Sequence, residues 1–100
     1  MTEDFRAPKG KFSLGKVVTT AGVHKEIDHY AIFEVLDRHA NCDWGDICDE
    51  DKKSNLAALD FEERLVSAYM VSDKERNESK VYVITEWDRS VTTVLFPSEY

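Results

Sequence analysis

The sequence predicts a small α+β domain, with two to three helices packed on an antiparallel sheet and a C-terminal three-stranded meander. Its 100 residues are the size of one domain. Its composition, 42% hydrophobic and 33% charged, is typical of a globular chain. The spacing of apolar residues changes from a helical period before Glu63 to a period of two after it. We expect a flexible N-terminal arm at residues 1–10 and a single domain over residues 11–100.

A short strand and a short helix should follow the arm. The run Val17–Thr20 is β-branched, which favours an extended backbone. Gly15 can form a turn or bulge just before this strand. Thr20 is a suitable N-cap for a helix that begins at Ala21.

The clearest helical pattern runs from Asp28 to His39. Its apolar face carries residues at i, i+3, i+4 and i+7, namely Ile32, Val35, Leu36 and His39. Asp28 can cap this helix, and Asn41 lies where it should end and can adopt the left-handed conformation.

A second main helix is expected from Glu50 to Phe61. Asp49 precedes it as a candidate N-cap, and the acidic first turn suits the positive end of the helix dipole. Leu56 and Leu59 form only a narrow apolar stripe, so this helix should bury less than the preceding one.

Three strand-like segments follow in the last third of the chain. They alternate and are rich in β-branched and aromatic residues, and they are Leu65–Val71, Lys80–Glu86 and Val91–Phe96. A charged loop, residues 72–79, joins the first pair, and residues 87–90 join the second pair. Such short connections predict antiparallel neighbours.

Charge is distributed unevenly along the chain. The net charge is −7, which argues against direct nucleic-acid binding, because nucleic-acid binders usually carry a basic patch. The segment from Glu26 to Glu63 contains twelve acids and three bases, for a local net charge of −9. This acidic segment can steer a protein partner with a basic surface, or it can simply keep the protein soluble. The sequence leaves the oligomeric state open.

Several classes of protein are disfavoured by what the sequence lacks. No stretch approaches the roughly 20 apolar residues that cross a bilayer, and the first residues lack the apolar segment of a signal peptide. The two cysteines, Cys42 and Cys48, lie close together and do not form a disulfide framework. We therefore expect a cytoplasmic protein with reduced thiols and no membrane contact.

No metal or cofactor is expected. Three potential zinc ligands lie close together in the sequence, namely His39, Cys42 and Cys48. Zinc usually takes four ligands, so this set is incomplete. The acidic loop at residues 43–51 does not keep the register of an EF-hand, since its glycine, Gly45, comes one position too early. No glycine-rich phosphate loop occurs in the sequence.

Signals for catalysis are weak. Cys42 lies near His39, but the surrounding acids should raise the thiol pKa and oppose a thiolate nucleophile. Glu86 and Asp88 could act as a carboxylate pair, although Arg89 could neutralise either one, and a structural turn network is the simpler interpretation. If the domain is an enzyme or binds a ligand, the candidate polar cluster is His39, Asp46, Glu86, Asp88 and Arg89.

Trp44 lies in a polar loop beside Gly45. A tryptophan in such a loop is either a lid over the core, which we favour, or an exposed anchor for a partner. The candidate partner-binding residues gather around it, and they are Asp43, Trp44, Asp46, Asp49, Glu50 and Asp51.

Several segments together resemble one family of proteins. These segments are Phe12–Thr20, Arg38–Asp46 with Glu50–Lys52 and Asn55, and Ile84–Tyr100. The most specific parts are Asp-Trp-Gly-Asp at residues 43–46 and Thr-Glu-x-Asp-Arg-Ser-x-Thr-Thr at residues 85–93. They resemble small proteins of roughly a hundred residues found on plasmids, phages and integrated elements, often labelled plasmid-related or, loosely, restriction subunit.

The resemblance implies a mobile-element protein and carries over no catalytic residue. The motifs of an adenine methyltransferase subunit are absent from the sequence, so the restriction label receives no support. We expect a non-enzymatic interaction domain whose acidic segment binds a basic protein surface. A sharper form of this hypothesis is a DNA mimic that acts against a defence complex. The alternative is a small enzyme or ligand-binding domain that uses the polar cluster.

Overall fold

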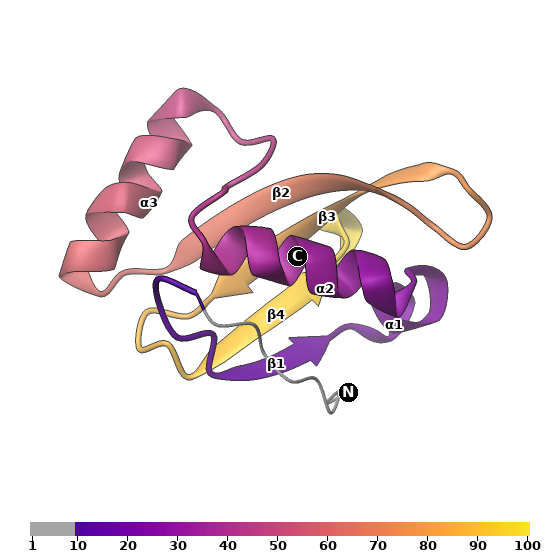
Figure 1. The fold of residues 1–100 in the computed structure, drawn as a ribbon, viewed down its shortest axis with the longest axis horizontal. Coiled ribbons are helices and arrows are strands. Elements are labelled where there is room, and N and C mark those ends of the chain that lie inside the picture. The colour runs from indigo at the N-terminus through magenta and orange to yellow at the C-terminus, as the bar shows by residue number, and fades with distance from the viewer. Residues whose placement is uncertain (1–9) are drawn as a thin grey trace.

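The computed structural model describes residues 10–100. Helices lie over one face of a four-stranded sheet, and the helix formed by residues 49–61 lies beside it (Figure 1). The elements in chain order are β1 (Lys16–Thr19), α1 (Ala21–Glu26), α2 (His29–Ala40), α3 (Asp49–Phe61), β2 (Leu65–Ser72), β3 (Glu78–Thr85), β4 (Val91–Leu95) and the 3-10 helix η1 (Pro97–Glu99). This architecture confirms the predicted α+β fold. The expected N-terminal arm lies outside the described residues, apart from Gly10. Within residues 10–100, every helix is too short or too polar to cross a bilayer.

The sheet has the strand order β1-β4-β3-β2. Strands β2, β3 and β4 are consecutive antiparallel neighbours, which confirms the predicted meander. Strand β1 instead runs parallel to β4, with Lys16 opposite Val91 and Thr19 opposite Val94. The sheet is therefore mixed, whereas the sequence predicted an antiparallel sheet. β1 is separated from β4 by most of the chain, so no short connection specified its direction.

The turn between β2 and β3 is shorter than the predicted loop, because the strands extend further at this end. Ser72 pairs with Glu78, so only residues 73–77 remain as the connection. The Asp73 carboxylate closes this turn by accepting hydrogen bonds from the backbone N–H groups of Glu75 and Asn77. The hairpin projects beyond α1 at one end of the molecule (Figure 1).

Helices α1 and α2 begin as predicted. Thr20 caps α1 by accepting a hydrogen bond from the N–H of Val23, and Asp28 occupies the N-cap position of α2. The end of α2 differs from the prediction. Asn41 has φ −97° and is not left-handed, whereas the next residue, Cys42, has φ +65°. The left-handed conformation that ends the helix is therefore one residue later than expected.

The main core lies between α1, α2 and one face of the sheet. Its buried side chains come from alternate positions in the strands and from the apolar face of α2, as the two sequence periods require. They include Val17, Val23, Ile27, Ile32, Val35, Leu36, Tyr69, Val81, Val83 and Val94.

Helix α3 packs beside the sheet and differs from the prediction in two ways. Cys48 is its N-cap and Asp49 is its first residue, so Asp49 does not cap the helix. Leu56 is 55% exposed, because α3 turns Asn55 and Ala58 toward β2 instead. The Asn55 side chain bonds both backbone groups of Val66 at the sheet edge, and this contact fixes which face of the helix is inward.

Candidate functional site

His39 is a structural residue of the core. It is fully buried on α2, and its two ring nitrogens bond the hydroxyl groups of Ser67 and Thr85. The Thr85 hydroxyl bonds that of Thr92 at 2.7 Å, and Thr92 donates to the carbonyl of Leu14 at 2.7 Å. A buried chain of hydrogen bonds therefore connects α2 with three strands and the segment before β1. Both nitrogens of the ring are occupied, as expected for a core histidine.

Burial also determines the charge of His39. Desolvation, with a smaller contribution from the positive charge of Arg89, lowers the pKa of His39 to about 3. The imidazole is thus neutral at physiological pH. Because no solvent reaches the ring, it cannot exchange protons with a substrate at the surface.

The side chain of Arg89 donates hydrogen bonds to backbone carbonyls. One terminal nitrogen donates to the carbonyl of Glu63 at 2.6 Å and to those of Glu86 and Trp87 at 3.2 Å. The other donates to the carbonyl of Ala58 at 2.9 Å. The guanidinium group therefore joins the turn between β3 and β4 to the end of α3, and both of its terminal nitrogens are engaged by backbone carbonyls.

The remaining residues of the candidate polar cluster do not complete a site. Glu86 lies 3.5 Å from Arg64, and Asp88 accepts a hydrogen bond from the N–H of Ser90 within its own turn. Bonding to Ser90 lowers the pKa of Asp88 below its usual value. Asp46 is exposed in the loop before α3. The structure does not bring these side chains together around one cavity.

Trp44 forms a lid over the second, smaller core. It is 4% exposed and stacks on Phe12 with ring centroids 6.2 Å apart. Its ring also meets the edge of His39, and it packs with Ala58 and Leu65. The lid interpretation is confirmed. Trp44 is therefore no longer a candidate partner-binding residue, because its buried side chain cannot contact a partner.

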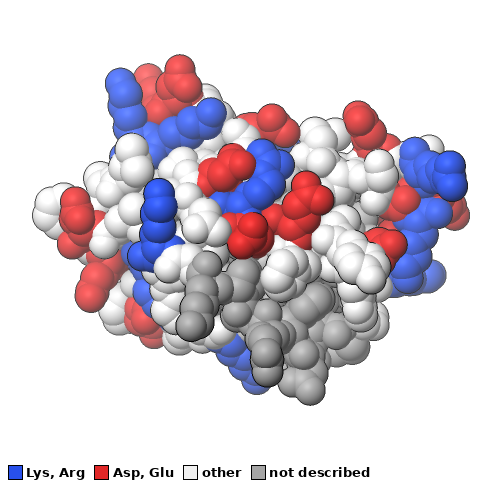
Figure 2. All heavy atoms as spheres, in the orientation of Figure 1, with Lys and Arg blue, Asp and Glu red and all other residues white. Residues whose placement is uncertain are grey.

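The acids of the middle segment lie at the surface. All twelve carboxylate residues between positions 26 and 63 are exposed, namely Glu26, Asp28, Glu34, Asp37, Asp43, Asp46, Asp49, Glu50, Asp51, Asp60, Glu62 and Glu63. Figure 2 shows acidic and basic side chains interspersed on the face that α2 covers. The acids of the segment are thus spread over the surface, and on this face they do not form one uniform acidic patch.

Asp43 differs from its acidic neighbours because it has a partner. Its carboxylate bonds the guanidinium of Arg38 at 2.7 Å, and it accepts the N–H of Gly45 at 3.2 Å. The bond to Arg38 lowers the pKa of Asp43 below its usual value. This pair holds the loop between α2 and α3, so Asp43 contributes less free charge than Asp46, Asp49, Glu50 and Asp51, for which the structure gives no ion pair within residues 10–100.

The cysteines show neither catalytic nor metal-binding geometry. Both are free thiols, and burial is the main cause that raises the pKa of Cys42, which disfavours the thiolate. Within residues 10–100, no three His, Cys, Asp or Glu side chains are close enough to hold a metal ion. The ring nitrogens of His39 are already bonded to the hydroxyl groups of Ser67 and Thr85, so His39 is not available as a metal ligand beside Cys42.

A chelator should therefore leave the protein's stability unchanged. We expect equal melting temperatures with and without EDTA, since a structural zinc site would contribute to the folding free energy. Thermal unfolding monitored by circular dichroism measures this directly. A fall of many degrees in EDTA, reversed by added zinc, would contradict the structure.

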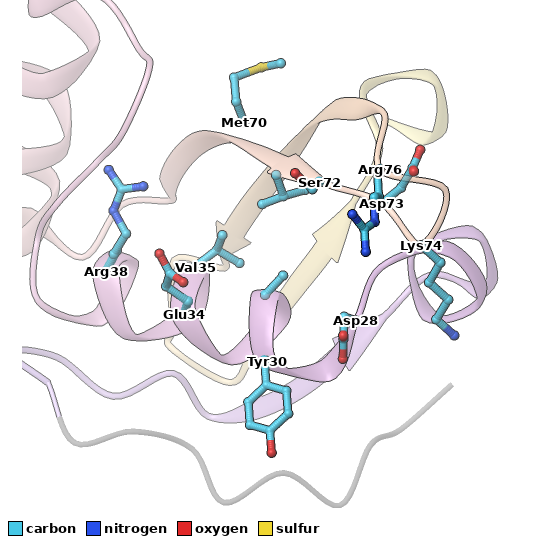
Figure 3. A pocket seen from close by; sticks show the side chains of 12 residues that line it. Asp28, Tyr30, Glu34, Val35, Arg38, Met70, Ser72, Asp73, Lys74 and Arg76 are labelled. Carbon is cyan, nitrogen blue, oxygen red and sulfur yellow. The ribbon is translucent and has the colours of Figure 1, made fainter.

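One groove was missed by the sequence analysis. It has a volume of about 600 Å³ and lies between α2 and the outer edge of β2 (Figure 3). Its walls carry Tyr30, Glu34, Arg38, Met70, Ser72 and Arg76. The alternation within β2 was visible in the sequence, but the position of β2 at the sheet edge was not, so nothing pointed to a groove there.

Comparison with protein-family models, curated proteins and solved structures finds no match. The function is therefore inferred from the geometry of the residues themselves.

Proposed function

We propose that this chain is a non-enzymatic interaction domain whose acidic segment, residues 26–63, docks on a basic surface of another protein. The observation that carries the proposal is the exposure of all twelve acids of the segment. Exposed acids in excess attract a basic partner over a distance of about 10 Å at 0.1 M salt. The resemblance to mobile-element proteins suggests the setting in which such a domain acts.

The competing proposal is an enzyme or ligand-binding domain, but the residues that it would use have structural roles. His39 is buried, Arg89 holds backbone carbonyls, and Glu86 pairs with Arg64. A catalytic group has to reach the reacting atoms in a cleft, and these three side chains do not share one. This assignment supports the interaction domain over an enzyme.

Charge reversal in α3 is expected to weaken the interaction. The double variant Glu50→Lys, Asp51→Lys should lower the association rate for the partner by about tenfold at low salt, because steering depends on these charges. Dissociation should change less, and the difference between variant and wild type should shrink as salt rises. The partner is first captured from host lysate at low salt, and surface plasmon resonance then gives the rates.

A matched control is available in the turn between β2 and β3 and the first residue of β3. The variant Glu75→Lys, Glu78→Lys changes the net charge by the same amount, and both residues are exposed outside the acidic segment. It should retain nearly the wild-type association rate. Equal losses from the two double variants, or rates that ignore salt, would remove the acidic segment as the docking surface.

The sharper proposal is that the partner surface normally holds nucleic acid. In that case duplex DNA should compete with the protein for the same partner. The protein itself should not bind duplex DNA at physiological salt, because its acids repel phosphate. Competition measured by fluorescence anisotropy distinguishes this form from docking on any other basic surface.

A further inference from the structure

The side of α2 that faces away from the core exposes two aromatic rings beside two carboxylates. It carries Tyr30, Phe33, Glu34 and Asp37, opposite the buried side of the helix. Tyr30 is 87% exposed and Phe33 is 43% exposed. Residues four positions apart are neighbours on a helix, so Tyr30 lies beside Glu34, and Phe33 lies beside Asp37. We name these four residues the outer face of α2.

Helix stability does not explain this choice of residues. Tyrosine and phenylalanine form helices less readily than leucine or glutamate, and Tyr30 buries little of its ring in the fold. Glu34 and Asp37 are three positions apart, a spacing at which like charges repel and destabilise a helix. A single exposed aromatic residue is ordinary, whereas two neighbouring rings are typical of a contact surface. The outer face of α2 therefore has the composition of a binding surface.

Acidic charge prevails on α2. The helix contains one lysine or arginine, Arg38, and its guanidinium already bonds the carboxylate of Asp43 at 2.7 Å. Asp28, at the N-cap of the helix, adds a further carboxylate. Lys74 and Arg76 belong to the hairpin of β2 and β3 and lie across the groove from the helix (Figure 3). The outer face of α2 therefore attracts a positively charged group.

The fold already holds one guanidinium group with the same two kinds of partner. Arg38 bonds the carboxylate of Asp43 through two nitrogens, and its Cζ atom lies 4.7 Å from the centre of the Tyr69 ring. The carboxylate accepts charge-assisted hydrogen bonds, and the face of the ring attracts the cation. The outer face of α2 presents this combination twice, each time as a ring followed by a carboxylate one turn later.

The other strongly exposed aromatic residues already have an arginine beside them. The guanidinium of Arg89 bonds the carbonyl of Trp87 at 3.2 Å and also bonds the last turn of α3, which ends at Phe61. The guanidinium of Arg64 donates to the hydroxyl group of Tyr100 at 2.9 Å. A second cation is repelled at these positions. Charge therefore favours the outer face of α2 over the other exposed rings.

We propose that the outer face of α2 anchors the acidic docking surface by binding arginine side chains of the partner. The inference rests on the proposed function, because it assigns the docking of residues 26–63 to α2. A guanidinium group stacks on the ring of Tyr30 or Phe33 while its donors bond the neighbouring carboxylate. Arginine is preferred to lysine, because its planar group can do both at once and is less strongly hydrated. The other acids of the segment steer the partner toward this face.

The test uses the full chain labelled with nitrogen-15 and two blocked hexapeptides, one of arginine and one of lysine. The two peptides carry the same charge, so a difference between them reports the guanidinium group and not the charge. Titration at low salt, followed by the amide chemical shifts, should give about threefold tighter binding of the arginine peptide. The largest shifts should occur in α2, and both affinities should fall as salt rises.

Three variants separate the rings from the charges. The double variant Tyr30→Leu, Phe33→Leu keeps apolar side chains and a good helix former but removes both ring faces. It should bind the two peptides equally and keep the melting temperature. The double variant Glu34→Gln, Asp37→Asn should weaken both peptides by about threefold, because exposed ion pairs are lost. Trp87→Leu is the matched control, since it removes an exposed ring elsewhere, and it should keep the arginine preference.

Several results would overturn the α2 anchor. They are equal binding of the two peptides by the wild type, an arginine preference that survives in the double leucine variant or disappears in Trp87→Leu, and largest shifts outside α2. If binding still falls with salt and shifts residues 26–63, the acidic docking surface stands and only the anchor is wrong. If neither peptide binds, or if salt has no effect, both the anchor and the acidic docking surface are wrong.

Discussion

Acidification from pH 7 to pH 4 should destabilise the protein by roughly 3 kcal/mol through His39 alone. The unfolded chain binds a proton at His39 with a pKa near 6.5, whereas burial lowers the folded pKa to about 3. The neutral ring therefore contributes stability above pH 6.5, and this contribution is lost as pH falls from 6.5 toward 3. Urea unfolding at a series of pH values measures the effect.

The variant His39→Gln isolates this effect from other titrating groups. Glutamine does not titrate, yet it can still bond one of the hydroxyl groups of Ser67 and Thr85. The substitution should lower the free energy of unfolding by about 1–3 kcal/mol at pH 7, because one buried hydroxyl group loses its hydrogen-bond partner. Its stability should then fall with acid much less steeply than that of wild type. Parallel stability curves for the two proteins would show that His39 is not the buried neutral group.

Replacing Arg89 by methionine should lower the free energy of unfolding by about 2–3 kcal/mol. Methionine keeps the aliphatic part of the side chain but has no donors for the carbonyls of Ala58, Glu63, Glu86 and Trp87. Lysine should recover only part of the loss, since a single ammonium group cannot reproduce the geometry of two guanidinium nitrogens. Urea unfolding at pH 7 gives both values.

Arg64 provides the control for this experiment. Its guanidinium is exposed and lies 3.5 Å from the Glu86 carboxylate, an arrangement that contributes at most about 1 kcal/mol. Arg64→Met removes the same charge and the same number of donors. A cost equal to that of Arg89→Met would mean that the loss comes from charge rather than from the bonds to the backbone.

Local periodicity was sufficient to predict most of the fold. The apolar face of α2, the alternation in β2 and β3 and the Thr20 cap each depend on neighbouring residues, and all three were recognised. The position of β1 beside β4 and the edge position of β2 depend on long-range pairing, which a period cannot express.

The candidate site was only partly predictable for a different reason. Polar residue types that serve catalysis also serve structure, and sequence spacing does not separate the two uses. His39 was correctly placed on the core face, and Trp44 was correctly favoured as a lid. The role of Arg89 depends on carbonyls from α3 and from the preceding turn, which lie up to 31 positions away in the chain. That role becomes visible only in the folded structure.

The parallel pairing of β1 with β4 has a consequence for the order in which the chain folds. Thr92 in β4 bonds the carbonyl of Leu14, 78 positions earlier. Closing so long a loop costs entropy before any contact compensates for it, and such contacts slow folding. During synthesis, β1 remains without its neighbour until β4 has left the ribosome. The β2–β3 hairpin can form earlier, so β1 should be the last strand to join the sheet.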